Sequence, residues 1–173
     1  MIDRLKKIKL LILDVDGVMT DGRIIFDSNG VESKFFNVKD GHGIKMLQRA
    51  GIEVGIISGR QSKVVAIRAA ELGIERVFQK ATDKLAPYRQ ILDDTGLSDK
   101  EVAFIGDDLI DIPVLRRVGF AAAPADAVEE VMPFVHFVTK NSGGWGAVRE
   151  LSDLLLKAQG RWEELTARYF KEE

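Results

Sequence analysis

Dense apolar runs alternate along this chain with segments whose apolar residues recur at helical spacing. The first run, residues 8–13, is apolar at almost every position and does not alternate, which is typical of a strand buried on both faces of a parallel sheet. Further short runs predict strands at residues 53–57, 76–78, 102–105, 120–122 and 135–138. Parallel strands need long crossover connections, which are usually helices, so the pattern of the intervening segments tests whether the sheet is parallel.

Those intervening segments have the periodicity of helices. One helix is predicted from Gly41, with Ile44, Leu47 and Ala50 on one side, and the next carries Val64, Ile67 and Leu72 and stops at Gly73. A third opens at residues 82–84, and others are predicted near 109–118, 126–132 and 145–158. This alternation predicts an α/β fold with a doubly wound, Rossmann-like parallel sheet, in a single domain spanning residues 1–173.

Two segments depart from this alternation. Residues 23–37 contain two short apolar stretches joined by Asn29-Gly30, which predicts an inserted β-hairpin. Its apolar side chains need a surface to pack on, so the hairpin either folds over the site or meets other subunits. The tail, residues 160–173, has Trp162, Leu165 and Tyr169 at helical spacing and is either an amphipathic helix or disordered.

Charge and composition narrow the class of protein. The formal net charge is −2 and no dense basic block is present, so we expect no nucleic-acid partner. The chain has no cysteine, and no apolar run has the length of a membrane span. We therefore expect a soluble cytoplasmic protein that does not contact a membrane.

Polar residues follow several predicted strands at their carboxyl ends, where open α/β sheets bind ligands. Asp14 and Asp16 follow the first strand, Ser58 the second and Asp107 the fourth, while Lys84 begins a helix near the same edge. Two close carboxylates need a cation or a shared proton. Carboxylates, a lysine and a hydroxyl at one edge are the groups that phosphoryl transfer requires. Each motif alone is more often a turn or a helix cap, but together they favour a phosphoryl-transfer site.

The residues that carry this reading are Asp-Val-Asp-Gly-Val at 14–18, Ser58, Lys84 and Gly-Asp-Asp-Leu-Ile-Asp at 106–111. In this order they resemble the four motifs of the haloacid dehalogenase superfamily of phosphatases. The resemblance implies that Asp14 is the nucleophile, that Asp16 is the general acid and base, and that Ser58 and Lys84 hold the phosphoryl group. It further implies a Mg²⁺ ion bound by Asp14, Asp107 and the main-chain carbonyl of Asp16, an ion that prefers oxygen ligands. Asp108 or Asp111 would support the metal or Lys84, although Asp111 could equally cap a helix.

The chain has no room for a cap domain between these motifs, and it resembles the capless branch of the superfamily. The strings that carry this second resemblance lie at residues 16–22, 36–44, 106–111 and 143–150. It implies a substrate that is an eight-carbon keto sugar acid with phosphate at one end and carboxylate at the other. It also implies a homotetramer in which neighbouring subunits close each active site. The implied substrate contacts are Asp16, Asn37, Val38, Lys39, Asp40, Gly41, Lys45, Arg60, Arg68 and Lys84.

Several alternatives stay open. A nine-carbon sialic-acid-type 9-phosphate is the competing substrate. Arg60 and Arg68, about two turns apart on one helix, and Lys45 on the preceding helix could equally form a solvated basic face. From other functional classes, the chain could be a receiver-like phospho-acceptor domain or an inactive oligomeric scaffold. The receiver reading is weaker because the strand that should end in the acceptor aspartate ends in Ser58.

Overall fold

A six-stranded parallel sheet forms the centre of the computed structural model, which describes residues 1–170. The strand order is β5-β4-β1-β6-β7-β8, so that β1 lies between β4 and β6. The predicted doubly wound α/β fold is confirmed. The strands are β1 (Leu10–Leu13), β4 (Glu53–Ile57), β5 (Arg76–Phe78), β6 (Val102–Ile105), β7 (Phe120–Ala123) and β8 (Phe137–Val138).

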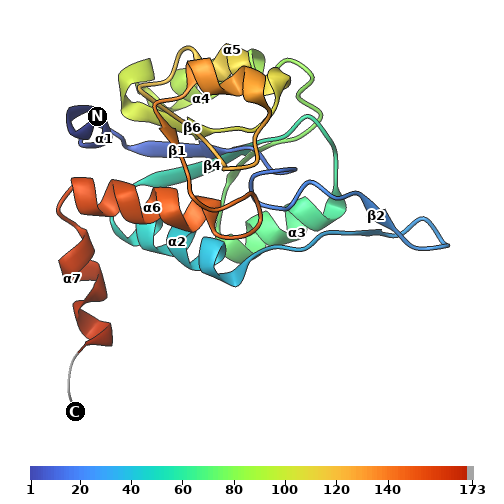
Figure 1. Cartoon of the computed structure of the whole chain (residues 1–173), viewed down its shortest axis with the longest axis horizontal. Helices are drawn as coiled ribbons and strands as arrows, with labels where there is room; N and C mark the ends of the chain where they lie inside the picture. Colours follow the sequence, from blue (N-terminus) through green and yellow to red (C-terminus); the bar gives the residue numbers. More distant parts are fainter. Residues whose placement is uncertain (171–173) are drawn as a thin grey trace.

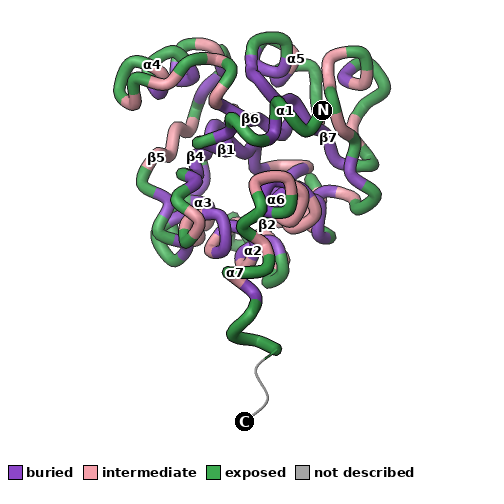
Figure 2. Tube along the Cα trace, turned by 90° about the vertical axis from the view of Figure 1, so that its left-hand side faces the viewer, coloured by how far each residue is buried: buried purple, intermediate pink, exposed green. Residues whose placement is uncertain are grey.

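Helices cover both faces of the sheet (Figure 1). α2 (Val38–Arg49), α3 (Lys63–Leu72) and α6 (Ala147–Ala158) lie on one face, and α4 (Leu85–Thr95) and α5 (Ile112–Leu115) lie on the other. Alternate residues of β1 pack into the two layers, since Leu11 and Leu13 belong to one core and Leu10 and Ile12 to the other. Figure 2 shows the buried strands enclosed by helices whose outer surfaces are exposed. The remaining helices are α1 (Ile2–Leu5), α7 (Trp162–Thr166), η1 (Asp99–Glu101), η2 (Leu109–Asp111), η3 (Glu129–Phe134) and η4 (Ala167–Tyr169).

Some helices differ from their predicted form. α2 begins at Val38 rather than Gly41, because the Asn37 side chain accepts a hydrogen bond from the Lys39 N–H and caps the helix there. The helix predicted near 109–118 is a 3₁₀ turn followed by the single turn of α5, and the one near 126–132 is the 3₁₀ helix η3. α3 buries Val65, Ala69 and Leu72, whereas Ile67 lies exposed. The helical period alone does not say which of two overlapping apolar stripes meets the sheet.

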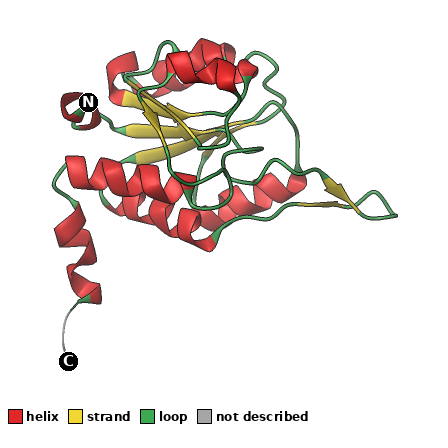
Figure 3. Cartoon of the chain, viewed as in Figure 1, coloured by secondary structure: helices red, strands yellow, loops and turns green. Residues whose placement is uncertain are grey.

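The predicted hairpin is present as β2 (Ile25–Phe26) and β3 (Glu32–Ser33), an antiparallel pair that projects from the body as an arm (Figure 3). Asp27 closes its turn by accepting hydrogen bonds from the N–H groups of Asn29 and Val31. Along the second strand the side chains alternate, since those of Glu32, Lys34 and Phe36 turn inward, with that of Lys34 buried, and the residues between them are exposed. The hairpin therefore turns two charged side chains toward the body and apolar ones toward solvent.

The C-terminal tail continues from α6 into the short helix α7, and Trp162 and Leu165 pack against the core. Tyr169 lies beside Arg49 and His42 of α2. Residues 171–173 of the predicted tail lie outside the described part of the chain. Within residues 1–170, no helix combines the length and the apolar character that a membrane crossing requires.

Candidate active site

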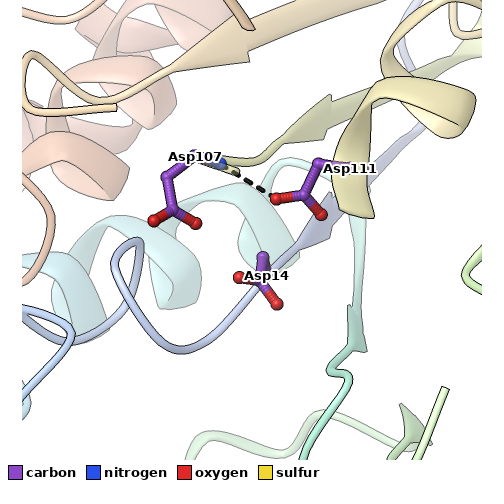
Figure 4. A group of neighbouring side chains, drawn as sticks. All are labelled: Asp14, Asp107 and Asp111. Carbon is purple, nitrogen blue, oxygen red and sulfur yellow. Dashed lines mark hydrogen bonds between the residues drawn. The ribbon is translucent and has the colours of Figure 1, made fainter. Parts of the chain in front are cut away.

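Three carboxylates meet at the carboxyl ends of β1 and β6. Asp14 directly follows β1 and Asp107 follows β6 after one glycine, and the two strands are paired with Leu13 opposite Ile105. Asp111, at the end of η2, supplies the third carboxylate, and oxygens of all three lie within 4.8 Å of one another (Figure 4). This cluster lies where the sheet changes winding direction, between the β1–β4–β5 half and the β6–β7–β8 half, which is the usual ligand site of such folds.

A buried lysine neutralises part of this charge. Lys84 lies at the N-cap position of α4, and its Nζ is 2.6 Å from Asp14 Oδ1 and 2.6 Å from Asp111 Oδ1. Burial by itself would lower the pKa of Lys84, but the attraction of Asp14 and Asp111 outweighs it and raises this pKa above its ordinary value. Lys84 therefore stays charged and holds the Asp14 carboxylate in place.

Asp111 fixes both the lysine and the loop that carries Asp107. Its Oδ1 accepts from Lys84, and its Oδ2 accepts hydrogen bonds from the N–H groups of Asp107 (3.0 Å) and Asp108 (3.2 Å). Asp108, in contrast, is exposed and caps η2 by accepting a hydrogen bond from the Leu109 N–H. Asp111 thus combines the two roles that the sequence left open, as a helix cap and as a support for Lys84.

Burial and neighbouring negative charge disfavour the charged forms of the other two carboxylates. Burial raises the pKa of Asp14 to about 6, although Lys84 opposes the shift. Burial, together with the charges of Asp14 and Asp111, raises the pKa of Asp107 to about 8. The Asp107 Oδ1 atom is buried without a hydrogen-bond partner among the described residues. Carboxylate oxygens that lack a donor suit a hard cation such as Mg²⁺, so the residues present fit the expected metal.

Glycines bring the loops around the cluster into close contact. Gly17 has φ +95°, and a Cβ atom there would lie 2.0 Å from Asp107 Oδ2. A Cβ on Gly143 would lie 1.8 Å from the Gly17 carbonyl oxygen. The loop after β1 is therefore clamped between the Asp107 loop and the loop that precedes α6, which leaves no space for side chains at these positions.

Ser58 follows β4 at the same edge of the sheet. Its N–H donates to the carbonyl of Phe78 on β5, and its buried Oγ accepts a hydrogen bond from the Arg60 N–H at 3.3 Å. The hydroxyl keeps its own proton, which it can donate to a ligand oxygen.

Asp16 lies apart from the carboxylate cluster and forms ion pairs with two cations. Its Oδ1 contacts the Nζ of Lys34 from the hairpin, and its Oδ2 lies 3.7 Å from the Nε of Arg60. Sequence reasoning missed Lys34 because we read the hairpin only for its apolar residues. The signal available was the spacing of Glu32 and Lys34, which places both side chains on one side of a strand.

The predicted substrate contacts do not all converge. Arg60 precedes the Ser62 N-cap of α3, so the expectation that it shares a helix with Arg68 is wrong. Arg68 pairs with Glu71 and lies over the Phe36 ring. The Nζ of Lys45 donates to the Leu72 carbonyl at 2.6 Å, at the carboxyl end of α3. Within one chain, Arg60 is the predicted basic contact that reaches Asp16.

Residues 37–41 form the N-cap and first turn of α2. Val38 and Lys39 are exposed there, and Gly41 packs against the Arg68 guanidinium. Asn37 also donates through its Nδ2 to the Gly144 carbonyl at 3.3 Å. The buried Asp40 carboxylate accepts hydrogen bonds from the N–H groups of Gly146 and Arg149, at the start of α6. In one chain these residues tie α2 to the loop before α6.

Comparison with known proteins places these observations in a family. The family model of haloacid dehalogenase-like hydrolases matches residues 38–119. The 3-deoxy-D-manno-octulosonate 8-phosphate phosphatase of Escherichia coli strain K12 is 47% identical over 94% of this chain and 87% of the relative.

Solved structures agree with the sequence match. The phosphatase of that name from Yersinia pestis superposes with a TM-score of 0.92 at 48% identity, covering 94% of this chain and 88% of the other. The corresponding enzyme from Moraxella catarrhalis, solved with a magnesium ion, a phosphate ion and a KDO molecule, superposes with a TM-score of 0.95 at 39% identity over 97% of each chain.

Proposed function

The chain belongs to the 3-deoxy-D-manno-octulosonate 8-phosphate phosphatases, a group of haloacid dehalogenase-like hydrolases, and we propose that it cleaves the phosphate monoester of this eight-carbon sugar acid. The products are KDO, for lipopolysaccharide biosynthesis, and inorganic phosphate. The observation that carries the proposal is the Asp14 carboxylate held by Lys84 at the carboxyl end of β1, beside Asp107. This arrangement offers a fixed nucleophile in a site built for a phosphate and a cation.

In the first step Asp14 attacks phosphorus and forms an aspartyl phosphate. The bond between phosphorus and the sugar oxygen breaks, and Asp16 donates a proton to the departing alkoxide. In the second step Asp16, now a carboxylate, takes a proton from water as the water oxygen attacks phosphorus. Phosphate leaves and the Asp14 carboxylate is restored, so one group acts as acid and then as base.

The other residues bind the phosphoryl group. Lys84 neutralises charge on Asp14 and on the phosphoryl oxygens, and the Ser58 hydroxyl donates a hydrogen bond to one of those oxygens. A Mg²⁺ ion held by Asp14, Asp107 and the Asp16 carbonyl supplies the remaining positive charge when bound. Asp111 holds Lys84 in place by accepting a hydrogen bond from its Nζ. Arg60 is the basic side chain that we assign to the substrate near Asp16.

Four copies of the chain complete the site in this proposal. A capless chain offers a long sugar acid few contacts beyond its phosphate, so selectivity needs walls from a neighbouring subunit. Ile24, Phe26 and Phe35 of the hairpin arm are all more than half exposed, which supports an assembly through the outer face of the arm. In this proposal the assembly decides whether the other expected substrate contacts, Asn37–Gly41, Lys45 and Arg68, reach a substrate.

The test is phosphate release from KDO 8-phosphate and from a nine-carbon sialic-acid-type 9-phosphate, before and after EDTA treatment. We expect the eight-carbon substrate to have the higher kcat/KM, EDTA to abolish turnover and Mg²⁺ to restore it. Asp14→Asn should lower kcat by about 10³-fold or more while the thermal unfolding midpoint stays near that of the wild type. The exposed Asp93→Asn is the matched control.

A higher kcat/KM for the nine-carbon substrate would make that compound the natural one. Absence of phosphate release from both substrates with Mg²⁺ present would show that the chain is not this phosphatase.

A further inference from the structure

We propose that Lys34, on the hairpin of the same chain, is the positioning residue that orients the Asp16 carboxylate for proton transfer. The inference deepens the proposed function and rests on it, because it presumes that Asp16 is the general acid. It assigns the hairpin arm a role in the active site of its own chain, in addition to any contact with a neighbour.

Lys34 is placed at a site where an unpaired ammonium group would be costly. Its side chain is 1% exposed, and its Nζ contacts Asp16 Oδ1 and lies 3.4 Å from Glu32 Oε1. A buried ammonium loses most of its hydration, and only a well-placed partner offsets that loss. Asp16 is that partner, and it is a group that the chemistry uses.

The polarity of the hairpin points the same way. Glu32 and Lys34 stand two residues apart and project to one side, toward the body, while Val31 and Phe35 project outward and are 58% and 62% exposed. A hairpin used only for contacts between subunits needs no charged inner face. The charged inner face of this hairpin forms ion pairs with Asp16, through Lys34, and with Arg60, through Glu32.

The second oxygen of Asp16 faces a cation from another element. Arg60, in the loop after β4, places Nε 3.7 Å from Asp16 Oδ2 and Nη2 3.4 Å from Glu32 Oε1. The Ser62 hydroxyl donates to Glu32 Oε2 at 2.5 Å, which fixes Glu32 between the two cations. Lys34 thus makes the hydrogen-bonded contact to Asp16, and the Arg60 guanidinium faces the other carboxylate oxygen at ion-pair distance, so the two cations favour one orientation of the carboxylate.

The position of Asp16 affects the cleavage of one bond, that between phosphorus and the leaving oxygen. When phosphorus transfers to Asp14, the bond from phosphorus to the leaving oxygen breaks, and an alkoxide must receive the Asp16 proton to depart. A nitrophenolate leaves without that proton because it is a weak base. Misplacing Asp16 therefore slows the cleavage of alkyl phosphates far more than that of an activated aryl phosphate.

The experiment compares kcat/KM for KDO 8-phosphate and for 4-nitrophenyl phosphate in Lys34→Met, which removes the charge and keeps the length. The quantity kcat/KM covers the steps up to departure of the leaving group and is independent of phosphoenzyme hydrolysis. We expect a loss of about 10²-fold for the sugar phosphate and less than about threefold for the aryl phosphate. Lys63→Met, an exposed lysine at the start of α3, is the matched control and should change neither value. An equal loss for both substrates would overturn the proposal.

A double-mutant cycle separates this inference from the proposed function. In an Asp16→Asn background, Lys34→Met should cause no further loss for the sugar phosphate, because Lys34 acts through Asp16. A further loss of tenfold or more there would mean that Lys34 acts elsewhere. Full activity of Asp16→Asn alone would overturn the acid–base assignment itself. If Lys34→Met does not fold, Lys34→Gln, which also removes the charge, carries the same comparison, and the same selective loss for the sugar phosphate is then expected.

Discussion

At the scale of single residues, the acidic cluster gives the metal-free protein a distinctive dependence of stability on pH. The pKa of Asp107 is about 8 and that of Asp14 about 6 in the folded chain, both above the ordinary value of 3.8. Between about pH 4 and pH 8 the folded state therefore keeps protons that the unfolded state releases. The stability that these two groups contribute is fully present below pH 4 and is lost as the pH rises through their folded-state pKa values.

We therefore predict that the urea midpoint of the EDTA-treated protein falls between pH 5 and pH 8, relative to that of Asp107→Asn. With Mg²⁺ present the trend should reverse, because the ion binds the deprotonated carboxylates and stabilises the folded state more as the pH rises. Urea titrations at four pH values, with and without Mg²⁺, measure both trends. Parallel pH profiles for the wild type and Asp107→Asn in EDTA would contradict the assignment.

At the scale of elements, a single aspartate couples α2 to α6 across a large sequence separation. Asp40 is buried in the first turn of α2, and its two oxygens accept from the Gly146 N–H (3.3 Å) and the Arg149 N–H (2.7 Å). These are N–H groups at the start of α6, which have no partner within that helix. The negative charge also lies at the positive end of the helix dipole.

Asp40→Ala removes this cap and leaves both N–H groups without it. We predict that the free energy of unfolding falls by about 1–3 kcal/mol, the usual cost of unsatisfied buried donors. Chemical denaturation measures the change, and Asp93→Ala on the exposed side of α4 is the control. A change as small as that of Asp93→Ala would show that water replaces the Asp40 contacts at no cost.

At the scale of the whole molecule, the exposed outer face of the hairpin arm lies at the opposite end of the fold from α1 (Figure 1). We predict that Phe26→Asp or Phe35→Asp breaks the proposed tetramer, since a charge on that face opposes apolar burial. KM for the sugar phosphate should rise by about tenfold or more, and KM for 4-nitrophenyl phosphate should change little, because the small substrate needs only the Asp14 centre. Ile2→Asp on α1 is the control, as Ile2 is also more than half exposed.

Sedimentation decides the first half of this prediction and paired kinetics the second. A wild-type chain that sediments as a monomer would contradict the assembly. A variant that loses both substrates equally would show that the arm does not form a wall for the sugar.

The sequence by itself determined the strands and the residues that end them. Apolar runs specify buried strands because both faces of the sheet are covered, and Asp14 and Asp107 must lie at the carboxyl edge because a buried strand tolerates no unpaired carboxylate. Ser58 lies at the same edge because it directly follows β4. The hairpin followed from Asn29-Gly30 because few residues tolerate the backbone of that turn.

Only the tertiary structure decided which distant side chains meet. Lys34 reaches Asp16, Asp40 caps α6, Lys45 caps α3, and Asp111 joins Lys84 to the Asp107 loop. These pairs depend on strand order, on helix rotation and on where each loop turns back. The periodicity of a segment predicts which of its faces is buried, but not which other element packs against that face. Contacts between distant residues therefore depend on how all the elements pack together.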